Sequence, residues 1–283
     1  MSTATTETPS AWETAVARAA VYELLTRVLA FPTPAHWERL VEGVLPVASG
    51  LTTGDAAVDG PLGEVLGDVD RFAAAARGGR ALDELRDAHQ RLFTHIEPED
   101  CPPYETAYEP GDVFRQSDTM ADVGAFYRAH GVQVGGVERE RPDHLVTELE
   151  FMALMAVKEA HALAERGPEE VAECERTQAA FLSEHLGRWA PSTGRRIAAV
   201  GTSALLRDTG ALLAAWLERD MEHFGVTPIE VLDEPVPRPE PDDGGCGAEM
   251  MTVGGTVGPA GEPDPVPVEL GARRGAVPAS EER

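Results

Sequence analysis

The spacing of apolar residues constrains this chain more than any other feature of its sequence. Between residues 11 and 224 apolar side chains recur every three or four positions, as in Leu145, Leu149, Met152, Ala156 and Ala160. This is the repeat that places side chains on one face of an α-helix. The helical signal dominates the chain, and it therefore predicts an all-α fold.

Proline and glycine residues divide the helical sequence into segments. We expect helices at residues 11–30, 34–44, 62–77, 81–94, 117–130, 142–166, 169–190 and 192–224. The last segment contains Gly201 and Gly210, and either position is a candidate for a break. The pattern predicts a single helical bundle of about eight to ten helices.

Both ends of the chain differ from this central region. Residues 1–10 show no apolar repeat, and we expect a flexible N-terminus. Residues 11–232 form the expected helical domain. Residues 233–283 are acidic and rich in proline and glycine, a composition that cannot bury a core, and this predicts a disordered C-terminal tail.

Charge and cysteine content exclude several functional classes. The net charge is −25, so bulk attraction to a nucleic-acid backbone or an anionic membrane is excluded, whereas cationic partners are attracted. The cysteines Cys101, Cys174 and Cys246 are too far apart for a zinc site or a disulfide framework, which fits a reducing compartment. No secretory signal or membrane-spanning stretch is apparent, and we therefore expect a cytoplasmic protein without stable membrane insertion.

The sequence ERPDHLVTELEFM at residues 140–152 concentrates polar groups at a helix start. Pro142 suits the first helical position, and Asp143 is favoured there by the helix dipole. His144 and Glu148 are four residues apart, so they share a helix face and can pair. Capping does not account for all of these groups. One alternative is a helical metal-dependent hydrolase using His144 and Glu148, although a third ligand is not evident from the sequence.

The loop CPPYETAYEP at residues 101–110 is stiffened by proline and carries aromatic side chains. Two interpretations remain open: a connection whose tyrosines pack on the helices, or a rigid recognition loop presenting Tyr104, Glu105 and Tyr108. Phosphate-binding loops, serine nucleophile elbows and activated cysteines are not found in the sequence. The residues therefore offer no good case for catalysis, and we expect no cofactor and, outside the hydrolase alternative, no bound metal.

Taken together, these motifs resemble the TorD/DmsD/NarJ family of maturation chaperones for molybdenum enzymes. The matching segments are ERPDHLVTELEFM, PPYET with Tyr108, MADVGAFYRAHGV at 120–132 and FLSEHLGRW at 181–189. Thr106 stands where the family has serine, and Val132 stands where it has leucine. The resemblance covers roughly residues 12–225.

The resemblance implies a cytoplasmic, all-helical chaperone without catalytic activity or a cofactor of its own. Such proteins hold the apo catalytic subunit of a molybdopterin oxidoreductase until its bis-guanylyl molybdopterin cofactor (bis-MGD) is inserted, and many bind its twin-arginine leader before export. Carboxylates at the site would pair with the leader's guanidinium groups. The client- and leader-binding residues expected here are Tyr104, Glu105, Tyr108, Arg141, Pro142, Asp143, His144 and Glu148.

Overall fold

The computed structural model describes residues 10–44, 48, 51, 53–76, 80–93, 101–110, 113–135, 140–237 and 268–270. The helices in these residues are α1 (Ala11–Leu29), α2 (Pro34–Arg39), α4 (Ala56–Ala76), α5 (Arg80–Phe93), α6 (Val113–Ala129), α7 (Leu145–Glu165), α8 (Pro168–Phe181), α9 (Gly187–Val200) and α10 (Ala204–Phe224). Two π-helical turns, η1 (Leu40–Val44) and η3 (Leu182–Leu186), and one 3₁₀ turn, η2 (Glu105–Ala107), complete the helical structure. The predicted all-α fold is confirmed.

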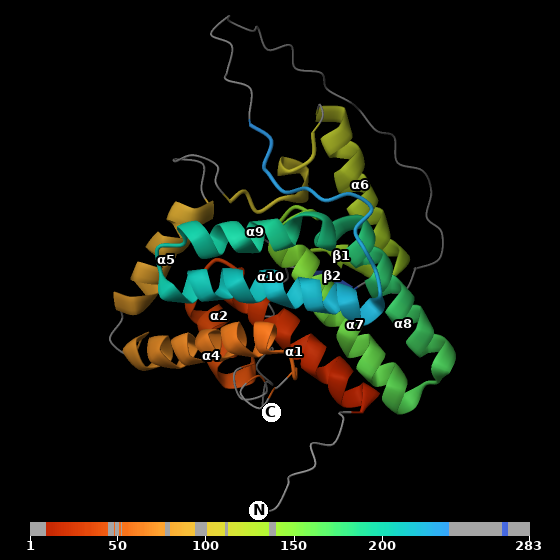
Figure 1. The fold of residues 1–283 in the computed structure, drawn as a ribbon, viewed down its shortest axis with the longest axis horizontal. Helices are drawn as coiled ribbons and strands as arrows, with labels where there is room; N and C mark the ends of the chain where they lie inside the picture. Colours follow the sequence, from red (N-terminus) through yellow and green to blue (C-terminus); the bar gives the residue numbers. More distant parts are fainter. Residues whose placement is uncertain are drawn as a thin grey trace, which may run out of the picture.

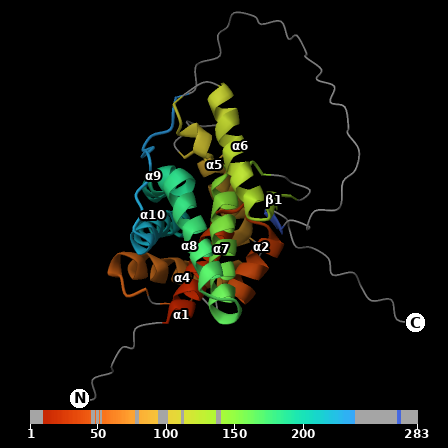
Figure 2. The ribbon, with the colours of Figure 1, turned by 90° about the vertical axis from the view of Figure 1, so that its right-hand side faces the viewer.

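The bundle is organised around α7, which lies against α1 on one side and α8 on another, while α10 lies against α9 and α4 (Figure 1; Figure 2). The apolar stripe of α7 faces this interior. Its members Leu145, Leu149, Met152, Ala156 and Ala160 are all at most 7% exposed. Burial of such a stripe is the main force that holds a helix in place.

One buried arginine joins four of these helices. Arg18 of α1 donates to Asp220 of α10 at 2.6 Å, to Glu159 of α7 at 2.8 Å and to Gln178 of α8 at 2.7 Å. The hydroxyl of Tyr22 also donates to Asp220, at 2.6 Å. Every partner of the buried guanidinium is itself hydrogen-bonded, as a buried charge requires.

After α10 the chain turns back over the bundle. Gly225 ends the helix with φ 64°, a left-handed conformation that glycine adopts without strain. The segment that follows, residues 226–237, is called the C-terminal strap here. Beyond the hydrogen bond from Val226 N–H to Met221 O at the end of α10, it forms three backbone hydrogen bonds with more distant parts of the protein. The pairs are Ile229 N–H to Ser183 O, Leu232 N–H to Arg188 O, and Val236 N–H to Ala107 O, at 2.8–3.0 Å.

The strand structure in the described residues is small. β1 (Val132–Val134) pairs in parallel with β2 (Val268–Leu270), in the register Val132–Val268. Most of the predicted flexible ends, residues 1–9, 238–267 and 271–283, lies outside the described residues. The described part of the predicted tail comprises residues 233–237 of the strap and β2.

Several predicted helix boundaries were wrong. α4 begins at Ala56 rather than residue 62 and contains Pro61, because Asp55 supplies the cap: its side chain accepts from Ala57 N–H at 2.9 Å. α6 begins at Val113 instead of residue 117. The predicted break near residue 191 does not occur, since α9 continues through Pro191; the interruption comes at Gly201, one of the two expected positions.

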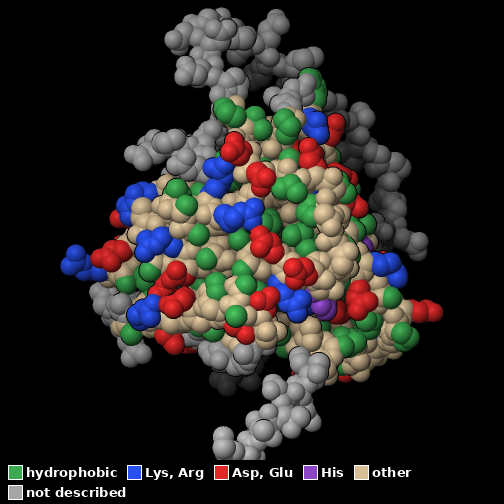
Figure 3. All heavy atoms as spheres, viewed as in Figure 1, with side chains coloured by type: hydrophobic (Ala, Val, Ile, Leu, Met, Phe, Trp, Pro, Cys, Tyr) green, Lys and Arg blue, Asp and Glu red, His purple; other side chains and the backbone are tan. Residues whose placement is uncertain are grey.

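Within the described residues, no helix combines the length and the apolar character needed to cross a bilayer. On the face drawn in Figure 3, acidic, basic and apolar side chains are interspersed. The acidic excess is therefore not gathered into one patch on this face.

Candidate functional site

Two segments singled out in the sequence lie against each other. The backbone N–H of Glu105 donates to Asp143 O at 3.0 Å, and Leu145 N–H donates to Pro103 O at 2.9 Å. Tyr104 and His144 form an isolated antiparallel bridge between these contacts. The loop of residues 101–110 and the helix start of residues 140–145 are therefore one structural unit, here called the loop–helix junction.

Asp143 holds the two halves of the junction together. Its carboxylate is fully buried and accepts from the Thr106 hydroxyl at 2.7 Å and the Thr106 N–H at 3.3 Å. Arg141 donates to the same carboxylate through Nε at 2.9 Å and Nη2 at 2.7 Å. Both oxygens of Asp143 are thus occupied within the protein.

His144, and not Pro142, begins the helix. It is the N-cap residue of α7, and its Nδ1 accepts from Val146 N–H at 3.2 Å. Burial lowers the pKa of His144 to about 4, with Asp143 opposing this shift. The ring is therefore neutral near pH 7, as an accepting Nδ1 requires. The predicted helix start at residue 142 was wrong, because Pro142 and Asp143 belong to the preceding turn.

The predicted contact between His144 and Glu148 is replaced by other contacts. Glu148 is fully buried and accepts from Trp189 Nε1 at 3.3 Å. Burial, together with the nearby carboxylates Glu105 and Asp143, raises its pKa well above the usual range. Among the described residues, no group of three or more His, Cys, Asp and Glu side chains is placed to hold a metal ion.

Glu105 and Tyr108 are also internal. The fully buried Glu105 carboxylate accepts from Arg188 Nη1 at 2.9 Å and lies 3.2 Å from His185 Nδ1. Burial raises the pKa of Glu105, while His185 and Arg188 act against that shift. The centre of the Tyr108 ring lies 5.3 Å from that of the Trp189 ring. Burial raises the pKa of the Tyr108 hydroxyl.

The remaining four predicted residues are partly exposed and form the rim of the junction: Tyr104, Arg141, Pro142 and His144. The Arg141 guanidinium lies 4.4 Å from the centre of the Tyr104 ring, and the Tyr104 ring lies 5.2 Å from the His144 ring. A small cavity of about 60 Å³ opens beside His144, between Pro103 and Phe31. The rim thus combines cationic, aromatic and apolar groups on a fixed backbone.

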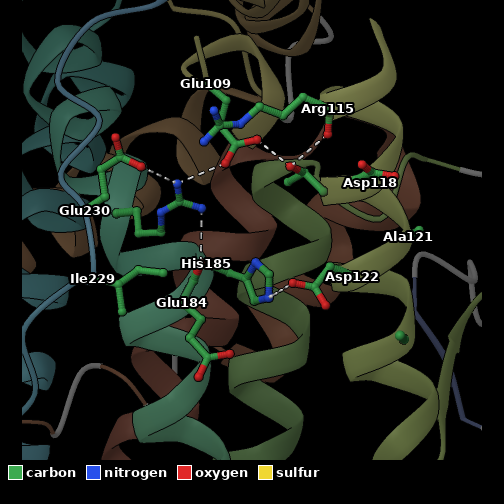
Figure 4. Close-up of a pocket in the computed structure, with 12 residues that line it drawn as sticks. Glu109, Arg115, Asp118, Ala121, Asp122, Glu184, His185, Ile229 and Glu230 are labelled. Atoms are coloured by element: carbon green, nitrogen blue, oxygen red, sulfur yellow. Dashed lines mark hydrogen bonds and ion pairs between the residues drawn. The ribbon is translucent and has the colours of Figure 1, made fainter. Parts of the chain in front are cut away.

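A larger groove opens behind the loop, between α6, η3 and the strap. It has a volume of about 840 Å³ and is lined by Glu109, Arg115, Asp118, Thr119, Ala121, Asp122, Ala125, Glu184, His185, Arg188, Ile229 and Glu230. Figure 4 shows the ring of His185 turned toward Asp122. No role for these residues was predicted from the sequence, although the motif FLSEHLGRW contains His185 and Arg188.

Comparison with known proteins finds one family model and several relatives that match this chain. The family model described as "Nitrate reductase delta subunit" matches residues 55–193. The selenate reductase assembly chaperone protein of Thauera selenatis is 29% identical over 210 residues, which cover 74% of this chain and 90% of that protein. These matches show that the chain is similar to the NarJ/TorD chaperones.

Two further relatives are similar to about half of the chain. The nitrate reductase molybdenum cofactor assembly chaperone NarJ of Escherichia coli is 28% identical over 139 residues, 48% of this chain and 52% of that protein. The chaperone protein TorD of Vibrio vulnificus is 28% identical over 133 residues, 47% of this chain and 60% of that protein.

The similarity to the NarJ/TorD chaperones bears on two sequence predictions. The resemblance stated from the four motifs is confirmed by both the family model and the relatives. The relatives bear the names of chaperones, so the prediction of a non-enzymatic protein is confirmed and the alternative of a metal-dependent hydrolase is wrong.

Proposed function

We propose that this protein is a cytoplasmic maturation chaperone for a molybdopterin oxidoreductase. It binds the apo catalytic subunit and that subunit's twin-arginine leader, and it holds the subunit until bis-MGD has been inserted. The similarity to the NarJ/TorD chaperones supports this function, because the relatives are named as assembly chaperones for selenate reductase and nitrate reductase.

The main structural support for this proposal is that the loop–helix junction has a buried half and a partly exposed rim. Its buried half, centred on Asp143 and Glu105, uses its polar groups internally. Its rim leaves Tyr104, Arg141 and His144 partly exposed at fixed positions. A surface that is already ordered loses little conformational entropy when a partner binds. The rim is therefore suited to client contact, and the buried residues support it without touching the client.

Co-purification from the native cytoplasm, with the bound proteins identified by mass spectrometry, tests the function. A molybdopterin oxidoreductase catalytic subunit lacking bis-MGD is the expected partner. Recovery of that subunit only in its cofactor-loaded form, or of no such subunit, would contradict the proposal.

A matched pair of variants tests the rim in a second experiment, in which each chaperone is co-expressed with the identified subunit. Tyr104→Ala removes a rim side chain, whereas Trp12→Ala removes another aromatic side chain, 48% exposed on α1. We expect Tyr104→Ala to weaken subunit binding by about tenfold, the range of an aromatic contact residue, and Trp12→Ala to leave it unchanged. Equal affinity of the two folded variants for the subunit would contradict the claim that the rim contacts the client.

A further inference from the structure

The groove behind the loop carries an excess of negative charge. Five carboxylates line it, from Glu109, Asp118, Asp122, Glu184 and Glu230, together with two arginines. Only one of these arginines, Arg188, lies deep in the protein, with a side chain 7% exposed. The carboxylate of Asp122, in contrast, is 75% exposed.

Arg188 is already shared among three carboxylates. Its Nη1 donates to Glu105 at 2.9 Å, and its Nη2 lies 2.9 Å from Glu109 and 3.2 Å from Glu230. One buried guanidinium therefore contacts three carboxylates at one end of the groove. The carboxylates at the other end, including Asp122 and Glu184, add negative charge that Arg188 does not balance.

His185 provides a second, independent observation in the same groove. Its side chain is 3% exposed, and its Nδ1 lies 3.2 Å from the Glu105 carboxylate. Because an ionised carboxylate only accepts hydrogen bonds, Nδ1 donates to Glu105, and the tautomer with its ring proton on Nδ1 carries a lone pair on Nε2. Nε2 is buried and has no hydrogen-bond partner among the described residues.

The carboxylate oxygen that faces this lone pair is another hydrogen-bond acceptor. Asp122 Oδ2 lies 4.0 Å from His185 Nε2, beyond hydrogen-bond distance, and Figure 4 shows the two groups facing each other. Two acceptors without a donor between them create a site for a group that carries several N–H donors. A guanidinium has five such donors in a planar fork.

We propose that this groove binds an arginine side chain of a cationic client segment, with the guanidinium donating to His185 Nε2 and to Asp122. Ile229, whose side chain is 70% exposed at the edge of the groove, provides apolar contact for the aliphatic part of that segment. The inference rests on the proposed function and assigns the cationic part of the client to this groove.

The groove and the rim are connected through one residue. The backbone N–H of Glu105 donates to Asp143 O in the loop–helix junction, while its carboxylate contacts His185 and Arg188 beside the groove. The two surfaces are thus built on opposite sides of the same loop. The Glu105 carboxylate acts as a positioning group, because it sets which nitrogen of His185 faces the groove.

Fluorescence anisotropy with the full chain tests the groove. The probe is a labelled synthetic peptide in which two adjacent arginines precede a run of leucines. Asp122→Asn keeps the shape of the side chain and removes its charge, and Asp70→Asn makes the same change at an exposed position on α4, outside the groove. The pair separates a specific contact from the general attraction of the net charge of −25.

We expect Asp122→Asn to weaken peptide binding by about fivefold or more, the effect of losing one charge-assisted hydrogen bond, and Asp70→Asn to change it less than twofold. A peptide with two lysines in place of the arginines should bind more weakly to the wild type, because lysine lacks the planar fork. Equal binding by the two variants, or failure of the wild type to bind the arginine peptide, would overturn the inference.

A spectroscopic measurement follows the decisive atom itself. In histidine ¹H–¹⁵N spectra, the arginine peptide should shift the Nε2 resonance of His185 while leaving that of the exposed His161 on α7 in place. An unmoved His185 signal at saturating peptide would also overturn the inference. Failure of the groove is distinguishable from failure of the proposed function: Asp122→Asn would then still retain the apo catalytic subunit, whereas a failed function means that the wild type retains none.

Discussion

Arg141 donates two parallel hydrogen bonds to Asp143, from Nε to Oδ1 at 2.9 Å and from Nη2 to Oδ2 at 2.7 Å. The two residues are separated by Pro142 alone, so the contact closes a tight turn immediately before α7. The carboxylate is fully buried, while the arginine side chain is 42% exposed. The pair therefore connects the interior of the junction to its rim.

Replacing Asp143 by alanine should destabilise the protein substantially. The change leaves the buried Thr106 hydroxyl and the half-exposed Arg141 without their acceptor, and losing hydrogen bonds to a buried charged group costs about 1.5–3 kcal/mol. Urea unfolding at pH 7 measures the loss. Asp83→Ala is the control, because Asp83 is 73% exposed and its pair with Arg86 is worth about 1 kcal/mol or less. Similar small losses in both variants would show that Asp143 does not hold the junction.

The pH dependence of stability should report the neutral state of His144. Its pKa is about 4 in the folded protein and 6.5 in the unfolded chain, so only the unfolded chain takes up the proton between these values. Stability therefore falls as the pH drops through this window. From pH 7.5 to 5.0 the contribution of His144 amounts to about 2 kcal/mol.

His144→Asn isolates that contribution. The asparagine oxygen accepts the same Val146 N–H as an N-cap but does not titrate. Urea unfolding of the wild type and the variant at both pH values gives a double difference. Residues such as Glu148, whose raised pKa acts in the opposite direction, cancel from it. Parallel pH profiles in the two proteins would contradict a neutral His144.

Arg188→Met should be far more damaging than Arg195→Met. Loss of the Arg188 guanidinium leaves Glu105 and Glu109 buried without their cation, at a cost of about 3–5 kcal/mol. Arg195 is 52% exposed and its pair with Glu218 contributes at most about 1 kcal/mol. Thermal and urea unfolding of both variants provide the comparison, and equal losses would refute this account of the groove wall.

Gly194→Ala and Gly63→Ala should change stability in opposite directions. A Cβ at Gly194 would lie 2.7 Å from Gly210 O and 2.9 Å from Ala214 N, so α9 and α10 would have to separate. Such overpacking costs about 1–3 kcal/mol. A Cβ at Gly63 in α4 would meet no atom within 4 Å, and alanine there should stabilise the helix by about 0.5–1 kcal/mol. Calorimetric melting temperatures that move together would contradict the prediction.

Truncation should locate the end of the folded domain. A chain ending at residue 228 loses Glu230, the buried Leu232 and the three backbone hydrogen bonds of the strap. A chain ending at residue 237 keeps them. We expect the shorter chain to be less stable by about 2 kcal/mol or more, the value of burying one leucine. Equal denaturation midpoints would show that the strap adds nothing to stability.

The helical pattern was enough to predict the fold class and most of the helices, because buried faces repeat with the helical period. It predicted wrong helix boundaries at two prolines, because proline usually ends or begins a helix. Pro61 and Pro191 both lie inside helices. The turn η3 precedes α9, and Gly187 allows the close approach of Leu182 O, which a Cβ would meet at 2.3 Å. Such a turn has no signature in the apolar spacing.

The candidate site was predicted as a set of residues but not as an arrangement. The two motifs do meet, and Tyr104 and Arg141 do reach the surface. Sequence alone did not show that Asp143, Glu105 and Glu148 are buried, because their partners include Arg188 and Trp189, which are remote in the chain. The role of the eight residues in client binding stays a prediction.

The backbone hydrogen bond between Ala107 and Val236 has a consequence for the order of events during synthesis. The loop that carries Tyr104 leaves the ribosome early, but the contacts that fix it come from residues made much later, with Arg188 lying 83 positions beyond Glu105. Contacts between distant segments form only after both segments are available. The loop of residues 101–110 therefore cannot reach its final form until almost the whole helical domain has been translated. Under the proposed function, client capture would wait until the chaperone itself is finished.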